Sequence, residues 1–513
     1  MKKIIALSLV LILALACLSF AGAEGVYPLN STEEITIWGV GSYSSKYASA
    51  AEDPWFAELI KRIGANIVFV EPARGADRTQ AYNLMLSGGT YTDIIMNADL
   101  VKNATARIEE KVIVPLNDYI DEYAPNLTRW MEENPEIRKT YTTENGDFIC
   151  FPYLRGSETA SGFWINQAWL TECALEVPET IDEVTNVLLA FKDKYNVTPF
   201  SMFQSVMDDE GTGRYGVMGT IYDAYGVPTR YSWFRDKEQK VHLSAYEEGY
   251  RNALKVFHSW FEQGLLDPDY ASVDKKLIAS KAAAGQIGLL QCDYQVYVKI
   301  DAALDGAENT WIPIKDPKVN KDDAHEYYTR LTATTTFGAC VTTACKNVPL
   351  ACRFFDYGYT EEGAIYYNFG KEDNYTMVDG QPSFTDEFNN DPRGAYTMMQ
   401  TYTAMSGNAP TLNLMAQFNS KPQVQKDAVN VWYTKDGLTH LMPGALTMTT
   451  EESTSIATEA TAIDAQVNEM ITKFILGEES LDNWDSFVAN LNSMGLEHVL
   501  EVRQAAYDRF LAR

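Results

Sequence analysis

Aromatic side chains beside short polar residues are the groups in this sequence best suited to ligand chemistry. The chain has 10 Trp, 30 Tyr and 22 Phe. Sugars present flat C–H faces that stack on aromatic rings, and their hydroxyls need short polar partners such as Asn, Asp and Gln. Each ring could equally be a core residue, so both interpretations stay open. The candidates are the aromatics expected in loops or at strand ends, namely Trp38, Tyr43, Trp164, Tyr231, Trp233, Tyr294, Tyr297 and Tyr367.

The sequence contains few of the residue patterns that enzymes use for catalysis. The sequence has no H-E-x-x-H, no G-x-S-x-G and no P-loop. Residues 39–41 resemble half of a dinucleotide fingerprint, but its sixth position is Ser44 instead of Gly. A carboxylate pair for glycoside hydrolysis stays possible, because 70 acidic residues offer many pairs. The acidic run 208–210 suits a solvated turn better than a calcium loop. We expect no enzyme activity, no cofactor and no bound metal.

The first 23 residues have the pattern of a secretory signal. Lys2 and Lys3 precede the apolar run Ile4–Phe20, and the small residues 21–23 form an A-x-A cleavage site. A membrane anchor is the alternative, but the run is short. A lipoprotein acylated at Cys17 is a third possibility, although such proteins usually carry Leu where Ala14 stands. We favour cleavage after Ala23, keep lipidation open, and find no other segment with 18 uninterrupted apolar residues.

Charge, length and cysteine content narrow the class of protein further. A net charge of −28 argues against a nucleic-acid partner. The length of 513 residues suits two or three domains. No cysteine pair has C-x-x-C spacing, and no zinc pattern is present. We expect buried or free thiols, with one or two disulfides as the alternative, among Cys150, Cys173, Cys292, Cys340, Cys345 and Cys352.

The first 100 residues predict an alternation of strands and helices that would position these side chains. Pro54 stands at the first position of a predicted helix, and Gly64 would end it. Strand–helix–strand–helix–strand is typical of the start of an open α/β sheet. The predicted elements are the strands Glu34–Trp38, Asn66–Val70 and Asp93–Met96 and the helices Pro54–Ile63 and Thr79–Leu86.

The segment Phe163–Tyr195 is the most informative stretch of the chain. Residues 163–165 read as a strand, which turns through Asn166 into a short helix, Ala168–Ala174. Thr180 and Glu183 have the spacing of a capping box for the helix that follows. That helix would bury one face formed by Val184, Val187, Leu188 and Phe191.

Further elements are predicted along the rest of the chain. The chain has no internal repeat and no obvious linker, so we expect interwoven domains instead of domains in series. Strands are predicted at Gln286–Leu290, Trp311–Ile314 and Thr334–Val341. Helices are predicted at Asn117–Tyr123, Pro125–Met131, Ala245–Gln263, Pro349–Tyr359, Glu361–Phe369, Glu451–Leu476, Leu481–Met494 and Glu497–Leu511.

Several segments, taken in order, resemble extracellular solute-binding proteins of ABC importers. The resemblance is to family 1, in the large lipoprotein-type branch of Gram-positive bacteria, with maltose-binding protein as a distant relative. The opening match is Phe163–Tyr195, and the most specific match is 345–386. The other matching segments are 84–97, 248–270, 282–297, 473–495 and 504–510.

The resemblance implies an α/β fold of the periplasmic-binding-protein type II kind. Two lobes would be joined by a hinge, with a ligand cleft between them that closes on binding and a helix-rich C-terminal part. Lobe 1 would comprise 24–155 and about 333–395, and lobe 2 would comprise 156–332 and about 396–513. The expected partners are a small-molecule ligand and the membrane permease subunits of an ABC importer. We expect a monomer at the bacterial cell surface, lipid-anchored through Cys17 or secreted.

Carried over by position, the resemblance also predicts which residues bind the ligand. Many relatives have an Arg where this chain has Asn166, which favours a neutral ligand over an anionic one. We therefore expect a sugar or oligosaccharide; a peptide or another solute is the alternative, and a secreted glycosidase is less favoured. The predicted ligand contacts are Trp38, Gly41, Asn97, Asp99, Trp164, Asn166, Asp293, Tyr294 and Tyr297.

Overall fold

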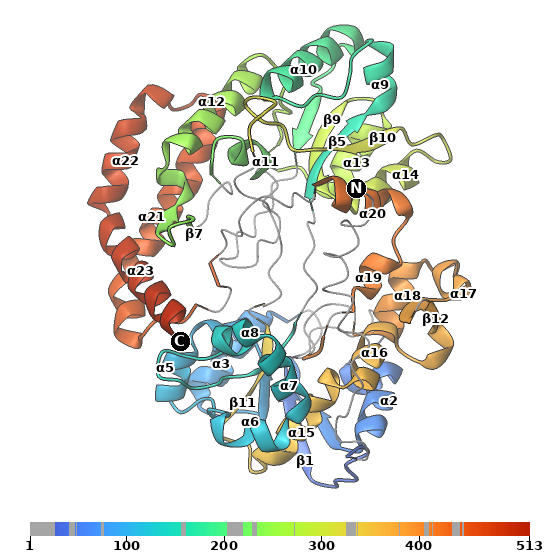
Figure 1. Ribbon diagram of the computed structural model, residues 1–513, viewed down its shortest axis with the longest axis vertical. Coiled ribbons are helices and arrows are strands. Elements are labelled where there is room, and N and C mark those ends of the chain that lie inside the picture. Colours follow the sequence, from blue (N-terminus) through green and yellow to red (C-terminus); the bar gives the residue numbers. More distant parts are fainter. Residues whose placement is uncertain are drawn as a thin grey trace, which may run out of the picture. The chain divides into compact units, whose positions relative to one another are not determined.

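A computed structural model describes the helices and strands of most of the chain (Figure 1). It describes residues 26–39, 47, 49–72, 76–154, 161–202, 219–227, 233–270, 272–324, 335, 337–378, 380–404, 410–412, 414–432, 442–443 and 446–513.

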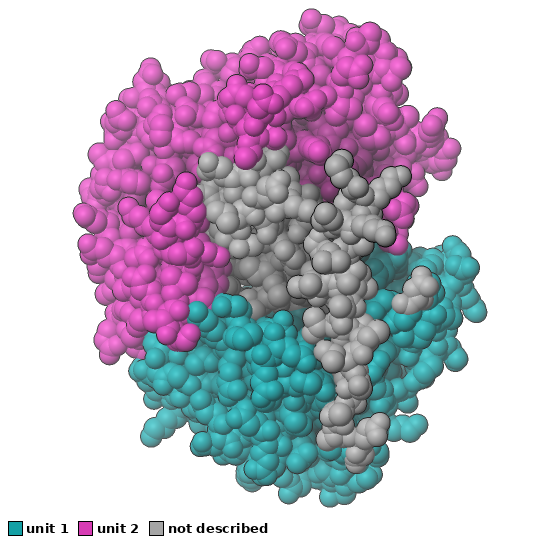
Figure 2. Space-filling model, viewed as in Figure 1, with its two compact units in different colours: residues 1–155, 334–420 teal, residues 156–333, 421–513 magenta. Residues whose placement is uncertain are grey.

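Two compact units share the chain, and each is built from separated stretches (Figure 2). Unit 1 comprises 1–155 and 334–420, and unit 2 comprises 156–333 and 421–513. The chain therefore passes from one unit to the other three times. The last passage follows Ser420, whereas we expected it near residue 395. The intervening α18 (Ala395–Tyr402) and α19 (Ala416–Asn419) contribute Met398, Met399 and Ala416 to an apolar cluster with Phe384 and Phe388.

Unit 1 is organised around a five-stranded sheet with the order β2-β1-β3-β11-β4. β1 is parallel to both β2 and β3, whereas β11 is antiparallel to β3 and β4. β11 lies between β3 and β4, so a strand from beyond residue 333 is inserted between two strands of the first stretch. The bounds are β1 Glu34–Trp38, β2 Asn66–Phe69, β3 Ile94–Met96, β4 Phe151–Pro152 and β11 Gly338–Val341.

The helices predicted in the first stretch of unit 1 are confirmed. Asp53 caps the N-terminus of α2 (Pro54–Ile63), and Gly64 ends it with a φ of 70°. Asp93 accepts hydrogen bonds from the backbone N–H and the hydroxyl of Thr36, at 2.8 and 2.6 Å, and so joins β1 to the start of β3. The remaining helices of this stretch are α3 Arg78–Gly88, α4 Ala98–Lys102, α5 Ala104–Glu109, α6 Asn117–Tyr123, α7 Pro125–Glu133 and α8 Pro135–Thr140.

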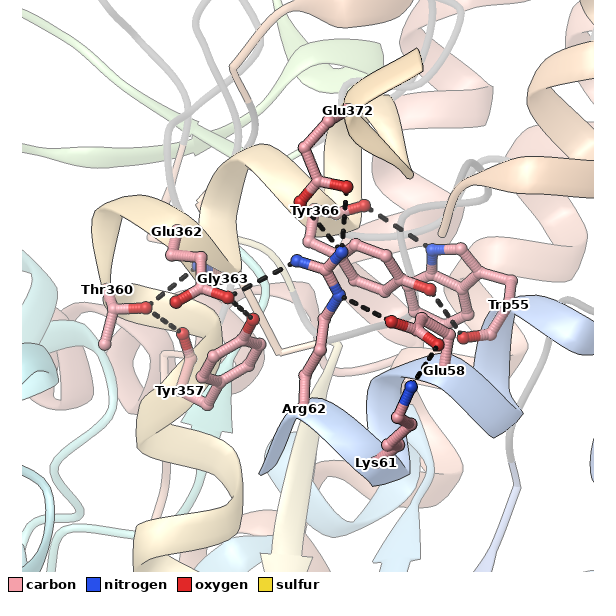
Figure 3. A network of polar contacts seen from close by, with 10 residues as sticks. All are labelled: Trp55, Glu58, Lys61, Arg62, Tyr357, Thr360, Glu362, Gly363, Tyr366 and Glu372. Carbon is pink, nitrogen blue, oxygen red and sulfur yellow. Dashed lines mark hydrogen bonds and ion pairs between the residues drawn. The ribbon is translucent and has the colours of Figure 1, made fainter. Parts of the chain in front are cut away.

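A polar network joins α2 to the stretch that returns after residue 333 (Figure 3). The Arg62 guanidinium pairs with Glu58 of its own helix and reaches Glu362 and Glu372, at 3.3 and 2.8 Å. It also lies over the ring of Tyr366, 4.5 Å from the ring centroid. The returning stretch contains α15 Val348–Asp356, α16 Glu361–Phe369, β12 Tyr375–Val378, β13 Gln381–Phe384 and α17 Asp386–Asn389.

Unit 2 contains a four-stranded sheet with the order β10-β5-β9-β6. β5 runs antiparallel to both β9 and β10, and only β6 is parallel to β9. A separate hairpin, β7–β8, lies beside α23. The bounds are β5 Ser161–Asn166, β6 Phe200–Met202, β7 Trp233–Arg235, β8 Val241–Leu243, β9 Leu289–Asp293 and β10 Trp311–Ile314.

The capping box and the buried face of the long helix are confirmed. Thr180 and Glu183 form the reciprocal bonds at the start of α10 (Ile181–Tyr195), and the predicted apolar face is at most 3 % exposed. Figure 1 shows α12, α21 and α23 side by side, as their contacts require. The other helices are α9 Gln167–Glu172, α11 Gly219–Asp223, α12 Glu248–Glu262, α13 Lys275–Ala283, α14 Val296–Ala303, α20 Gln423–Trp432, α21 Thr450–Leu476, α22 Trp484–Ser493 and α23 Leu496–Ala512.

Candidate functional site

The ends of two parallel strands in unit 1 form a pocket. Trp38 ends β1, and Asn97 and Asp99 follow β3; because β1 and β3 are parallel, their carboxyl ends meet at the same edge of the sheet. The pocket has a volume of about 370 Å³, within the range of ligand sites. Three predicted contacts are thereby brought together. The lining residues are Trp38, Gly39, Arg78, Thr79, Tyr82, Asn83, Met96, Asn97, Ala98, Asp99, Phe337 and Gly338.

Gly39 allows the chain to turn at the rim of this pocket. Its φ is +93°, in the region that favours glycine. A Cβ at this position would lie 2.4 Å from the carbonyl oxygen of Met96. Any other residue would therefore push β1 away from β3 where Trp38 and Asn97 meet.

A hydrogen-bonded group around Asp99 holds the polar side of the pocket. The Tyr82 hydroxyl donates to Asp99 Oδ2 at 2.6 Å, and Arg107 donates to the same oxygen at 2.9 and 3.0 Å. Burial, together with this bond to Asp99, raises the pKa of Tyr82, so its hydroxyl keeps its proton. Asn97 accepts from the backbone N–H of Asp99 and caps α4. The charge of Asp99 is thus matched by Arg107 within the protein.

Arg78 carries the positive charge that faces the pocket. Its Cζ lies 5.6 Å from the centroid of the Trp38 ring, and Tyr82 packs against the same Trp at 5.7 Å. The Arg78 side chain is 42 % exposed. Its Nη1 is 3.9 Å from Glu71 Oε1, and burial raises the pKa of that carboxyl. Trp38 is only 5 % exposed, and both Arg78 and Tyr82 lie against its ring.

Strand direction separates the predicted contacts of unit 2. Asn166 ends β5 and Asp293 ends β9, but these strands are antiparallel. Asp293 pairs with Ser161 at one end of the ladder, and Ile165 pairs with Leu289 at the other. Five residue steps, about 17 Å, separate Ser161, which is opposite Asp293, from Asn166. Asn166 and Asp293 therefore do not share one edge of the sheet, in contrast to Trp38 and Asn97.

Asn166 has a structural role in the described residues. Its side-chain oxygen accepts from the backbone N–H of Trp169 at 3.2 Å, which caps α9, and from the Thr310 hydroxyl at 3.0 Å. Asn166 is 8 % exposed. The prediction of a neutral ligand rested on an amide at this position, and the amide is occupied by these bonds. That argument therefore does not bear on the charge of the ligand.

Trp164 lies inside unit 2. It is 0 % exposed, with Tyr297 and Trp432 each 5.4 Å away between ring centroids. Trp432, from α20, also covers Gly162, where a Cβ would lie 2.4 Å from the indole ring. The face of β5 opposite the Phe163–Ile165 core face is therefore filled by rings. Trp164 packs against the Tyr297 ring and has no exposed surface that could contact a ligand.

The remaining predicted contacts of unit 2 cluster near the end of β9. Asp293 forms an ion pair with Lys275 and accepts from the backbone N–H of Gln295 at 2.9 Å. Lys421 Nζ lies 4.4 Å from the ring centroid of Tyr294, which is 5 % exposed. Tyr297 is half-buried. Of these residues, Tyr297 has the side chain most open to a ligand.

The other candidates divide into core residues and residues outside the described chain. Trp233 is 6 % exposed under Arg503, whose Cζ is 4.1 Å from its centroid. Tyr367 is 3 % exposed and packs edge-on against Trp55 at 5.3 Å. Both belong to the interiors of their units. Gly41, Tyr43 and Tyr231 lie outside the described residues, as do the signal, Cys17 and the acidic run 208–210.

Sequence reasoning missed Arg78 and Tyr82. Both lie on α3, four residues apart, so they share one helix face. The sequence therefore predicts that Arg78 and Tyr82 are neighbours on a helix. It does not show that this helix face covers the end of β1. Within the described residues, no group of His, Cys, Asp and Glu has the arrangement of a metal site. No helix in that part of the chain is long and apolar enough to cross a membrane.

The chain passes three times between two α/β units. This organisation defines a two-lobed binding protein of the periplasmic type II kind. The family of bacterial extracellular solute-binding proteins matches residues 43–365, more than half of the chain. The chain belongs to this family.

The chain aligns with several known proteins over most of its length. The fructooligosaccharide ABC transporter substrate-binding protein FusA of Streptococcus pneumoniae is 23 % identical over 472 residues, 85 % of this chain and 84 % of FusA. A structure of an HMO-binding, ABC-transporter-associated solute-binding protein from Bifidobacterium longum infantis superposes with a TM-score of 0.74. It is 17 % identical and covers 93 % of this chain and 99 % of its own. The alginate-binding protein AlgQ2 gives a TM-score of 0.73 at 19 % identity, with 93 % and 99 % covered.

Proposed function

We propose that this protein captures an oligosaccharide outside the cell and delivers it to the permease of an ABC importer. The observation that carries the proposal is the pocket at the shared ends of β1 and β3. It combines an indole ring with amide, carboxylate and guanidinium groups. Such a set suits the apolar faces and the hydroxyls of a sugar. The names of FusA and of the Bifidobacterium protein, both of which refer to oligosaccharides, support the same class of ligand.

The pocket residues have distinct roles in this proposal. Trp38 provides the stacking surface, and Asn97 and Asp99 fix the polar rim. Arg78 donates hydrogen bonds to ligand hydroxyls after leaving the face of Trp38. From unit 2 we keep Asp293, Tyr294 and Tyr297 as proposed contacts. Trp164 supports Tyr297 by ring packing, and Asn166 acts through the cap of α9. Gly41, Tyr43 and Tyr231 stay proposed contacts as well.

A ligand screen tests the proposal directly. A ligand that binds only the folded state raises Tm by mass action. We expect at least one oligosaccharide in a panel of neutral and uronate-containing chains to raise Tm in a saturable manner. A panel without any shift, together with a shift by peptides, would reject the sugar assignment.

Arg78→Ala tests the pocket itself. Loss of its donors should weaken the affinity for that oligosaccharide about tenfold, ~1.4 kcal/mol, in titration calorimetry. Arg503→Ala is the matched control, because Arg503 also lies over a Trp ring but in the core of unit 2. Equal loss of affinity in both variants would place the ligand elsewhere.

The remaining parts of the proposal concern partners, chemistry and location. We propose a monomeric receptor without catalytic activity, bound to a membrane permease in transport. Light scattering checks the monomer, co-purification with the permease checks the partner, and unchanged oligosaccharide after long incubation checks the lack of hydrolysis. The intact mass of the protein from its host distinguishes acylation at Cys17 from cleavage after Ala23.

A further inference from the structure

Two cysteines face each other in neighbouring strands of unit 1. β11 and β4 are antiparallel, with Gly338 opposite Pro152 and Ala339 opposite Phe151. Continuing this register by one residue places Cys340 opposite Cys150. Neither residue is close in sequence to the other, so only the return of β11 into the sheet brings them together.

The two side chains are also in contact on one face of the sheet. Cys150 and Cys340 are both 0 % exposed. Burial, and then the neighbouring Cys340 side chain, raise the pKa of the Cys150 thiol. A Cβ at residue 338 would lie 2.7 Å from Cys150 Sγ. Gly338 therefore leaves the space that this sulfur occupies, diagonally beside Cys340.

Strand geometry makes the pair suitable for a covalent bond. Directly opposed residues of antiparallel strands have Cα atoms about 4.5 or 5.5 Å apart, depending on the type of pair. Both separations fall within the range of about 4.4–6.8 Å that disulfides span. A bond between the two sulfurs thus requires side-chain rotation but no movement of a strand.

We propose that Cys150 and Cys340 form a disulfide in the exported protein. This step rests on the extracellular location of the family, where oxidising conditions preserve such bonds. The two thiols lose two protons and two electrons as the S–S bond forms. A small external disulfide, such as oxidised glutathione, accepts both electrons and is released as two thiols.

The bond forms during folding and not afterwards. Burial raises the pKa of the Cys150 thiol, so the folded protein holds little of the reactive thiolate. An external disulfide also has no access to a fully buried sulfur. Both barriers are absent while β11 is still outside the sheet.

The position of the bond gives it a structural effect. Cys150 is five residues before the first passage between the units, after Arg155, and Cys340 is six residues after Thr334, where the chain returns. The bond would close a loop that contains the whole first stretch of unit 2. Closing a long loop lowers the entropy of the unfolded chain and stabilises the fold.

Refolding with glutathione tests the proposal without any ligand, so its outcome is independent of the proposed transport function. The full-length mature protein is refolded with oxidised and reduced glutathione, unfolded, alkylated without reduction and digested. We expect two fewer alkylated cysteines than after reduction and one linked peptide pair containing Cys150 and Cys340. Complete alkylation of all cysteines, or a link between other cysteines, would overturn the proposal.

Variants separate the bond from simple packing. Cys150→Ser and Cys340→Ser should each abolish the linked peptide, while the partially buried Cys345, in Cys345→Ser, serves as the matched control and should keep it. The wild type and the control should have a Tm several degrees lower after refolding with reductant than after refolding with glutathione. An equal effect of reductant on the Cys150→Ser variant would contradict the assignment, and peptide mapping of the wild type decides the case if that variant does not fold.

Discussion

Unit 1 and unit 2 use the same kind of strand-end residue for different purposes. In unit 1, Trp38 and Asn97 end parallel strands and line a common pocket. In unit 2, Trp164 and Asn166 belong to one strand whose neighbours run the opposite way, and both are buried by later segments. Strand direction therefore decides whether such residues converge on a ligand or stabilise the fold.

The largest expected effect is on Trp164. Trp164→Ala removes an indole that is 0 % exposed and leaves a cavity between Tyr297 and Trp432. The free energy of unfolding of unit 2 should fall by about 3–5 kcal/mol in chemical denaturation. Trp164→Phe should lose less. If Trp164→Ala lost ligand affinity without losing stability, Trp164 would be a ligand contact, and the contrast with Trp38 would be wrong.

Asp99→Asn tests the corresponding polar group of unit 1. Asp99 accepts hydrogen bonds from Tyr82 and Arg107, and a neutral amide cannot replace the charged acceptor. We expect stability to fall by about 1.5–3 kcal/mol, and ligand affinity to fall as well because Tyr82 lines the pocket. Asp193→Asn, at an exposed site on α10, is the control and should change neither quantity. Unchanged calorimetric affinity in Asp99→Asn would remove this group from the site.

The two capping amides offer a closer comparison. Asn97 caps α4 and Asn166 caps α9, so each change to Ala should cost about 1 kcal/mol of stability. Ser at either position should recover most of that loss, since it also caps helices. Only Asn97→Ala should also weaken binding in calorimetry, because only Asn97 lines the pocket. Equal effects on binding would mean that both amides act only through the fold.

The smallest effect concerns pH. His242 lies 2.9 Å from both Glu247 and Asp236, and these carboxylates raise the pKa of His242. Its contribution, under about 1 kcal/mol, is fully present below the unfolded pKa of about 6.5 and is lost as pH rises through the raised folded value. His242→Gln should lower Tm at pH 5.5 but not above the folded pKa. Parallel Tm–pH profiles for both proteins would contradict this role.

Local signals predicted much of the fold. Pro54, Gly64 and the capping box at Thr180 gave helix ends that agree with the structure, because these signals act within a few residues. The strand expected at Gln286–Leu290 instead runs Leu289–Asp293. Gly288 lies in close contact with Trp169 and Phe191, where a Cβ would be 2.4 and 2.5 Å from their rings, so the preceding residues form a turn against that helix pair.

The site was harder to predict because its parts come from distant segments. Alternation along β5 correctly separates Trp164 from the core face of Phe163, but the sequence does not show that Trp432 covers the other face. The Arg78–Trp38 contact likewise depends on how α3 crosses the end of β1. Strand ends were therefore predictable, whereas the direction of the neighbouring strands and the covering segments were not.

The place of β11 between β3 and β4 has a consequence for biogenesis. The sheet of unit 1 stays in two pieces until residue 341 has joined it, although four of its strands lie before residue 153. Pairing across so long a separation is slow, because loop-closure entropy opposes it. This delay favours export, because a chain crosses a membrane unfolded. The N-terminal stretch, which contains β1 to β4, cannot complete its sheet before β11 is available.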